Sequence, residues 1–268
     1  MKLSITELLK QTKDLLKKDK IIFGPPIISA FIIYTITLQF PVNKLLDLSL
    51  NSILIILLLM AIYIITFGFV VNMVNALHRD SPITPALFKS VLKTKSVKLL
   101  LSAFCIYIPL TLFIIAVQYF ASFMVGIPIV SSLPILKNFV GVFSGLISIV
   151  GAIFCMYILF FLPIYIVIEG KGIGSTLKSA LNIVINHLSR VILVSCIVIN
   201  IKIVFSILSL LFLAVPVLGQ SFFLVLFKGI SDTIVYSLFV VFYFKIKTFN
   251  KTTPPITVDY DKSSIEIK

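Results

Sequence analysis

The chain has 268 residues, of which 59% are hydrophobic and only 12% are charged, and its formal net charge is +13. This composition lies far from that of soluble domains and indicates a protein that crosses a membrane several times. Spans of about 20 residues each leave little chain for a soluble domain, so we expect one polytopic membrane domain over residues 1–247. The basic residues lie in short segments between apolar runs, which favours an anionic membrane surface over nucleic acid as the partner.

The first segment of the chain has the pattern of an amphipathic helix. Ser4 and Glu7 have the spacing of a capping box, and Leu8 and Leu15 fall on the same helical face. Lysines occupy the opposite face. We therefore expect residues 4–18 to form a helix that lies along the membrane interface and does not cross it.

Uncharged apolar runs then predict six membrane spans, at about 25–42, 50–77, 99–123, 139–168, 191–217 and 221–244. Two segments between spans, 84–96 and 174–190, have apolar residues at helical spacing and predict two further interfacial helices. The expected fold is an all-α membrane protein with six transmembrane helices as three hairpins, each preceded by a cytoplasmic interfacial amphipathic helix. Residues 248–268 are expected to form a disordered cytoplasmic tail.

The basic residues predict the orientation of these spans. Of the 23 lysines and arginines, only Lys44 and Lys137 fall in the loops on the side opposite the termini. Because cytoplasmic loops carry the excess of basic residues, the side that holds the termini is expected to be the cytoplasm. The expected location is the cell membrane, with a multi-pass chain and both termini in the cytoplasm.

Small residues on the fourth predicted span indicate close helix packing. Gly141, Gly145, Ser148 and Ala152 recur at spacings of three and four residues. Such a stripe allows the backbone of a second helix to approach closely. We therefore expect a helix contact along this face.

The segment after the fourth span carries a family resemblance. Glu169 and three glycines precede the amphipathic stretch STLKSALNIVINHLSRVILV, which leads into the next span. This arrangement resembles the membrane domain attached to some glycerophosphodiester phosphodiesterases and its stand-alone relatives. The likeness covers about the last 110 residues, and the catalytic barrel of those fusions is absent from this sequence. The resemblance implies an integral membrane protein and implies no catalytic residues.

The motifs of enzymes and metal sites are missing, so we expect no enzymatic activity, no cofactor and no metal. His78 and His187 lie in different segments, without the HExxH, GxSxG or paired carboxylates that would give them a catalytic context. Cys105, Cys155 and Cys196 each fall inside a predicted span and lack the paired spacing of a zinc site.

Three charged residues, Lys202, Lys228 and Asp232, stand inside the predicted spans. Counted from the turn between the last two spans, Lys202 and Asp232 lie at similar depths near the middle of the membrane. An unpaired charge there costs at least about 3 kcal/mol, so we expect Asp232 to pair with Lys202, Lys228 or both. The cluster is either a neutralised clamp between two helices or the wall of a polar path.

Two functions therefore stay open. The first is a non-enzymatic membrane protein that binds or organises anionic lipid, or that acts as the membrane partner of an envelope protein. The second is a small transporter or permease with a polar path lined by Lys202 and Asp232. For the first function, the side chains expected to contact anionic head groups are Lys10, Lys13, Lys17, Lys18, Lys93, Lys95, Lys178 and Arg190.

Overall fold

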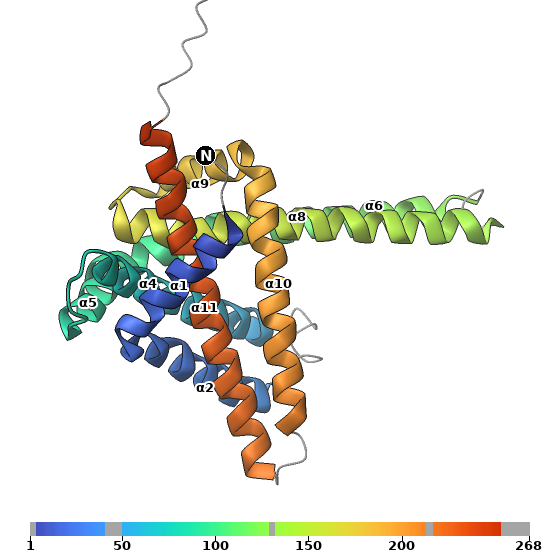
Figure 1. The fold of residues 1–268 in the computed structure, drawn as a ribbon. Helices are drawn as coiled ribbons and strands as arrows, with labels where there is room; N and C mark the ends of the chain where they lie inside the picture. The colour runs from blue at the N-terminus through green and yellow to red at the C-terminus, as the bar shows by residue number, and fades with distance from the viewer. Residues whose placement is uncertain (1–3, 41–49, 129–131, 213–216, 253–268) are drawn as a thin grey trace, which may run out of the picture.

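The computed structural model describes residues 4–40, 50–128, 132–212 and 217–252, and these residues are all-α (Figure 1). Six helical stretches in these ranges are long and apolar enough to cross a membrane. They are Lys20–Gln39, Asn51–His78, Pro85–Gly126, Pro134–Ile168, Leu188–Leu211 and Ser221–Thr248. The expectation of an all-α chain with six such helices is confirmed.

In chain order the described helices are α1 (Ile5–Lys18), the 3-10 turn η1 (Lys20–Phe23), α2 (Gly24–Gln39), α4 (Leu50–His78), α5 (Pro85–Ser90), the π turn η2 (Val91–Lys95), α6 (Ser96–Gly126), α8 (Pro134–Ile168), α9 (Ile173–Asn186), α10 (Leu188–Leu211) and α11 (Val217–Thr252).

Local sequence signals explain where several helices begin and end. The Ser4 hydroxyl accepts a hydrogen bond from the backbone N–H of Glu7 at 3.4 Å, which caps α1. α5 and α8 both begin with proline, whose missing N–H is not needed in a first helical turn. The turns after α4 and α8 each contain a residue with positive φ, Asp80 at 54° and Gly170 at 67°. A left-handed residue of this kind stops a helix.

The second expected interfacial helix, 84–96, is continuous with the span that follows it. α5 passes through the π turn η2 directly into α6. Asn72 of α4 anchors this segment, because its side-chain amide donates to the Leu87 carbonyl at 3.0 Å and to the Ser90 hydroxyl at 3.1 Å. The third expected helix, 174–190, begins one residue earlier at Ile173 and ends at Asn186, where a break at His187 separates α9 from α10.

α11 lies at the centre of the molecule and contacts α1, α2, α4, α8 and α10 (Figure 1). It is the most buried of the six apolar helices. Residues 235–243 of α11 form a continuous run of buried side chains, which includes Leu238, Phe239 and Phe242. Burial of aromatic and aliphatic side chains on several sides makes α11 the element around which the other helices pack.

A close helix crossing joins α2 to α11 at Gly229. A Cβ atom added to Gly229 would lie 2.6 Å from the Ile27 Cα and 2.9 Å from the Ile27 backbone nitrogen. Only a residue without a side chain allows the two backbones to approach this closely.

α6 and α8 lie along each other as a long pair that projects away from the other helices (Figure 1). Their outer halves expose apolar side chains such as Phe123 and Ile135. The close contact expected at Gly141 and Gly145 is not found, because a Cβ atom at either position would meet nothing within 4 Å. The close approach lies at Gly151, where an added Cβ atom would be 2.8 Å from the Phe113 ring.

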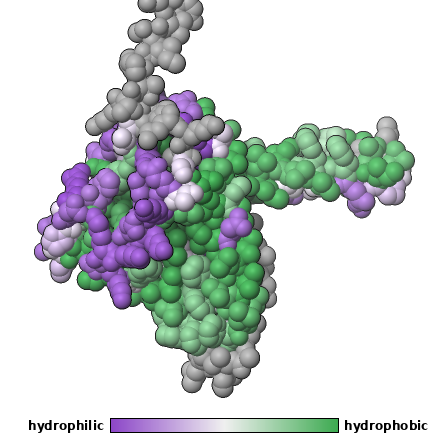
Figure 2. Space-filling view, in the orientation of Figure 1, coloured by the Kyte–Doolittle hydropathy of each residue, from purple (hydrophilic) through white to green (hydrophobic). Residues whose placement is uncertain are grey.

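The hydrophilic side chains gather at one end of the molecule, while the remainder of the visible surface is mostly apolar (Figure 2). At this end Lys18 pairs with Asp80 at 2.6 Å, and Lys95 donates to the Val167 carbonyl at 2.8 Å. We use the name basic end for the basic residues of α1, η1, η2, the turn between α8 and α9, α9, the start of α10 and the last turns of α11, which are Lys10, Lys13, Lys17, Lys18, Lys20, Lys93, Lys95, Lys171, Lys178, Arg190, Lys245 and Lys247.

Residues 248–252 of the expected tail are helical. α11 continues to Thr252, and residues 253–268 lie outside the described residues. The last turns of α11 are held by ion pairs, because Lys245 pairs with Glu7 of α1 and Lys247 pairs with Glu169 after α8. Glu7 and Glu169 are far from α11 in the sequence. A prediction based on local hydropathy therefore places the end of this helix too early.

Candidate functional site

Two of the three charged residues inside the predicted spans, Lys202 and Asp232, meet between α10 and α11. The Lys202 ammonium forms an ion pair with the Asp232 carboxylate and donates a hydrogen bond to the Ser231 hydroxyl at 3.0 Å. The Asp232 side chain is 11% exposed, whereas the Lys202 side chain is 41% exposed. The carboxylate is therefore enclosed by protein, and the ammonium reaches it from an open side.

The structure does not bring Lys228 into this ion pair. Among the described residues its ammonium lies over the ring of Tyr63 in α4, 5.3 Å from the ring centroid. An aromatic face attracts a cation, and the attraction is stronger where water is excluded. Of the two pairings expected for Asp232, the structure contains the one with Lys202.

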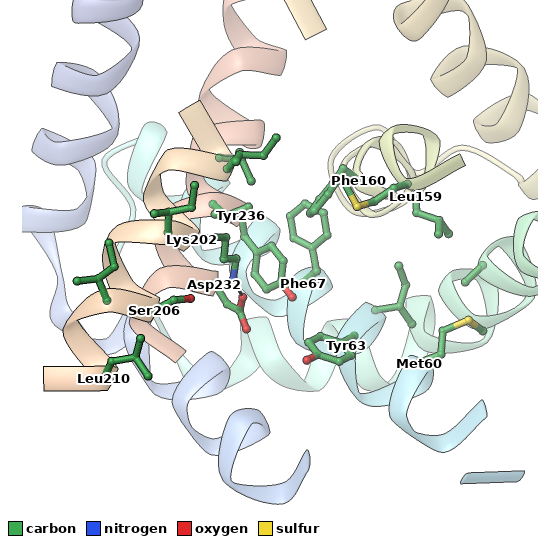
Figure 3. A pocket seen from close by; sticks show the side chains of 18 residues that line it. Met60, Tyr63, Phe67, Leu159, Phe160, Lys202, Ser206, Leu210, Asp232 and Tyr236 are labelled. Carbon is green, nitrogen blue, oxygen red and sulfur yellow. Dashed lines mark hydrogen bonds and ion pairs between the residues drawn. The ribbon is translucent and has the colours of Figure 1, made fainter. Parts of the chain in front are cut away.

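The open side of Lys202 is a cavity of about 760 Å³, which we call the central cleft. It lies between the α6–α8 pair and the α10–α11 pair, with α4 as its floor, and most of its lining is apolar (Figure 3). Figure 3 shows Lys202, Asp232 and Tyr236 on one wall, with Met60 and Leu159 across from them. The Tyr236 ring stacks on Phe67, with ring centroids 4.4 Å apart.

The expected lipid-contacting residues lie on several elements of the basic end. Lys10, Lys13 and Lys17 are exposed on α1, Lys93 is exposed in η2, and Lys178 is exposed on α9.

Three others are engaged within the protein. Lys18 pairs with Asp80 and donates to the Leu77 carbonyl, and Lys95 donates to the Val167 carbonyl. Arg190, at the start of α10, is half-buried and has an interaction of its own. These three side chains therefore contribute to the cohesion of the basic end.

A second cavity, of about 730 Å³, runs beneath α1, and we call it the α1 groove. Its rim carries Lys13, Lys17 and Lys20. Its floor is apolar and comes from η1, α2, α10 and α11, with Phe23, Ile27, Ile201, Ile230 and Ile234 among the lining residues. Lys13 and Lys17 lie one turn apart on α1, and Lys20 follows in η1 beyond the extended residue Asp19, so two elements bring the three lysines to the same groove.

A cluster that sequence reasoning missed joins α8 to α11. Glu169 accepts hydrogen bonds from Lys247 at 2.8 Å and from the Tyr243 hydroxyl, and it pairs with Lys171 at 2.9 Å. Lys171 also donates to the Ser179 hydroxyl of α9 at 2.8 Å. We call Glu169, Lys171, Tyr243 and Lys247 the Glu169 cluster. One signal was available, because Glu169 is one of only 10 acidic residues and directly follows an apolar run.

The electrostatics of Glu169 follow from these contacts. Burial raises the pKa of the carboxyl group, but hydrogen bonds from Lys247, Tyr243 and Lys171 outweigh burial and lower the pKa to about 2. At the break between α9 and α10, burial and the charge of Arg190 lower the pKa of the His187 side chain.

The histidines and cysteines lie on different elements of the described part of the chain. His78 stacks on the Phe244 ring with centroids 4.3 Å apart, and His187 stands at the break between α9 and α10. No three His, Cys, Asp or Glu side chains come together as a metal site in that part.

The fold and the site define the class of the protein. Six apolar helices, five of them arranged around the central α11, make this an all-α multi-pass membrane protein with a basic end and an ion pair within its apolar helices. The chain belongs to the family described as "Domain of unknown function (DUF7847)", whose model matches residues 4–249. No curated protein and no solved structure matches the chain. The resemblance to the membrane domain of glycerophosphodiester phosphodiesterases stays a prediction.

Proposed function

We propose that this protein is a non-enzymatic membrane protein that binds anionic phospholipid at the cytoplasmic surface of the cell membrane, and that the α1 groove is the binding site. The observation that carries the proposal is the chemistry of the groove. Lys13, Lys17 and Lys20 form its rim, and its floor is apolar. An anionic phospholipid matches this arrangement, because its charged head can lie against the lysines of the rim while its acyl chains lie against the apolar floor.

The energies of the two parts favour binding of one whole lipid. Each basic residue near an anionic membrane surface contributes about 1 kcal/mol of attraction. Each buried methylene of an acyl chain contributes about 0.8 kcal/mol relative to water. Because bilayer chains are already apolar, the charged rim supplies most of the preference between one lipid class and another.

The orientation proposed for the molecule supports this site. With the basic end at the cytoplasm, as the positive-inside rule requires, the rim lysines stand at the level of the lipid head groups. In this proposal α1, the α5–η2 segment and α9 are the three interfacial helices, and each precedes a pair of spans. Arrangement of anionic lipid around these helices could also serve an envelope protein that docks at the basic end.

The test is lipid selection by the purified full chain. The protein is reconstituted into liposomes of phosphatidylglycerol and phosphatidylcholine, extracted in mild detergent, and its retained lipids are quantified by mass spectrometry. We expect enrichment of phosphatidylglycerol that falls severalfold when Lys13, Lys17 and Lys20 are changed together to glutamine.

The matched control is the triple variant Lys10→Gln, Lys93→Gln and Lys178→Gln, which removes the same charge outside the groove. This variant is expected to retain most of the enrichment. An equal loss in both variants contradicts a site in the groove, and equal retention of the two lipids by the unaltered protein contradicts anionic lipid binding altogether.

A small permease is the second candidate, and the central cleft favours it, because Lys202 and Asp232 line a cavity that could be part of a path. A permease needs access to these residues from water on both sides in turn. Reaction of a cysteine at Ser206 with impermeant reagents from each side of the membrane distinguishes a path from a closed structural pair.

A further inference from the structure

The central cleft has one polar spot on an otherwise apolar surface. Lys202 and Ser206 lie one turn apart on α10, and Asp232 and Tyr236 lie one turn apart on α11. These four side chains converge on the same wall of the cavity (Figure 3). A polar group inside an apolar pocket orients a ligand and decides which head group the pocket accepts.

Two hydrogen-bond donors at this spot lack an acceptor in the described part of the chain. Tyr236 is only 7% exposed, and its hydroxyl has no hydrogen-bond partner among the described residues. A lysine ammonium has three N–H donors, and for Lys202 the structure describes acceptors at Asp232 and Ser231 only. The third N–H and the Tyr236 hydroxyl both adjoin the cleft.

Acyl chains of the bilayer could cover the walls of the cleft but could not satisfy these donors. An unpaired donor in an apolar environment costs several kcal/mol where no water is present. Lys202 stands 14 residues into α10, about 20 Å from the start of that helix at 1.5 Å per residue. The phosphate of a phospholipid in its normal position at the membrane surface lies too far away to accept from it.

The charge at this level of the spans is unbalanced. In the described residues of the predicted spans (25–40, 50–77, 99–123, 139–168, 191–212 and 221–244), the charged side chains are Lys202, Lys228 and Asp232. Two cations and one anion leave an excess of one positive charge in a region of low dielectric constant. A ligand with a single negative charge would neutralise this excess, whereas a second cation or a dianion would not.

We propose that the central cleft binds a single-chain lipid with a carboxylate head, that is, a long-chain fatty acid. One carboxylate oxygen accepts from the Lys202 ammonium and the other accepts from the Tyr236 hydroxyl. The acyl chain lies against Met60, Met156 and Leu159 on the far wall. Methionine side chains are flexible and adapt to chains of different shape. The volume of about 760 Å³ lies within the range of pockets that enclose small ligands.

This proposal is independent of lipid binding in the α1 groove, because the two cavities share no lining residue. The experiment uses the full chain in detergent micelles and measures binding of radiolabelled oleate by equilibrium dialysis. We expect saturable binding of one oleate per chain. Methyl oleate, which keeps the chain and removes the charge, is expected to compete at least tenfold more weakly. Phosphatidylglycerol is also expected to compete weakly.

Two tyrosine variants give a matched comparison. Tyr236→Phe keeps the ring that stacks on Phe67 and removes only the hydroxyl, so oleate affinity is expected to fall about five- to tenfold. Tyr119→Phe removes the hydroxyl of a tyrosine that is 77% exposed on the outer half of α6, and its oleate affinity should equal that of the unaltered chain.

A third variant tests the cavity itself. Leu159→Trp places a large ring in the cleft and is expected to abolish saturable binding without loss of the folded chain in size-exclusion chromatography. Non-saturable uptake of oleate, equal affinity in the Tyr236→Phe and Tyr119→Phe variants, or equal competition by methyl oleate would each overturn the proposal. Competition by phosphatidylglycerol at the strength of oleate would overturn the assignment to a single-chain carboxylate.

Discussion

The Lys247 ammonium of α11 lies 2.8 Å from a carboxylate oxygen of Glu169, the C-cap residue that follows α8. These two residues are 78 positions apart in the chain. This contact and the hydrogen bond from the Tyr243 hydroxyl join the last turns of α11 to the C-terminal end of α8. The Glu169 cluster therefore connects the two helix pairs that border the central cleft.

The first prediction concerns the pH dependence of this cluster. The pKa of Glu169 in the folded protein, about 2, lies below its ordinary value of 4.5. The stabilisation that the carboxylate provides is therefore complete above about pH 4.5 and is lost as the pH falls toward 2. We expect the melting temperature in detergent to fall between about pH 4.5 and pH 2, and to fall less in a Glu169→Gln variant.

The control for this measurement is Asp14→Asn, which removes an exposed carboxylate of α1 outside the Glu169 cluster. Its melting temperature should follow the unaltered protein over the same pH range. A Glu169→Gln variant with the full acid dependence of the unaltered protein would show that the cluster contributes nothing to acid stability.

The second prediction concerns the ion pair of Lys202 and Asp232. Asp232→Asn and Lys202→Met each leave one charge without its partner in an apolar region, so each should lower the free energy of unfolding by about 3–5 kcal/mol. The double variant strands neither charge and should recover much of the loss. Denaturant unfolding of the four proteins in detergent measures the coupling, and additive losses would contradict a direct interaction.

The third prediction concerns the crossing of α2 and α11. Gly229→Ala would place a Cβ atom 2.6 Å from the Ile27 Cα, so the two backbones must separate. We expect a loss of about 1–3 kcal/mol in the free energy of unfolding, the usual cost of overpacking.

Gly141→Ala is the control for this substitution, because nothing lies within 4 Å of an added Cβ atom there. Thermal unfolding should be almost unchanged. If Gly141→Ala proves the more damaging of the two, helix packing follows the small-residue stripe on α8 and not the crossing at Gly229.

The fourth prediction concerns orientation in the membrane. Single cysteines at Lys13 and Lys93 should resist an impermeant thiol reagent added to intact cells, in a background where the three native cysteines are alanine. A cysteine at Lys137, near the start of α8, should react under the same conditions. Labelling of the first two from outside, with protection of the third, would reverse the topology.

Much of the architecture could be predicted from local sequence patterns. The six apolar helices follow from uncharged runs long enough to cross a bilayer, and the start of α1 follows from the Ser4 capping signal. Hydropathy and capping depend on residues a few positions apart, so one sequence is enough to read them. The pairing of Lys202 with Asp232 could be predicted for the same reason, since both are counted from one turn, and the structure contains this ion pair.

Contacts between distant segments could not be read in this way. The small-residue stripe at Gly141 and Gly145 pointed to close packing, yet the close approaches occur at Gly151 and Gly229. A stripe shows that a helix can approach, but the direction in which the neighbouring helices run decides where it does. The Glu169 cluster was missed because Glu169 and Lys247 meet only when α8 and α11 end at the same level.

The sequence by itself determined the class of the protein, its number of spans and the separation of its basic segments from its apolar ones, because each depends on composition along a short window. Only the tertiary structure decided that Lys202 faces an apolar cavity, that Lys228 lies over Tyr63, and that three lysines rim a groove beneath α1. These features depend on how α6 and α8 diverge from α10 and α11, and that divergence results from side-chain packing between residues far apart in the chain.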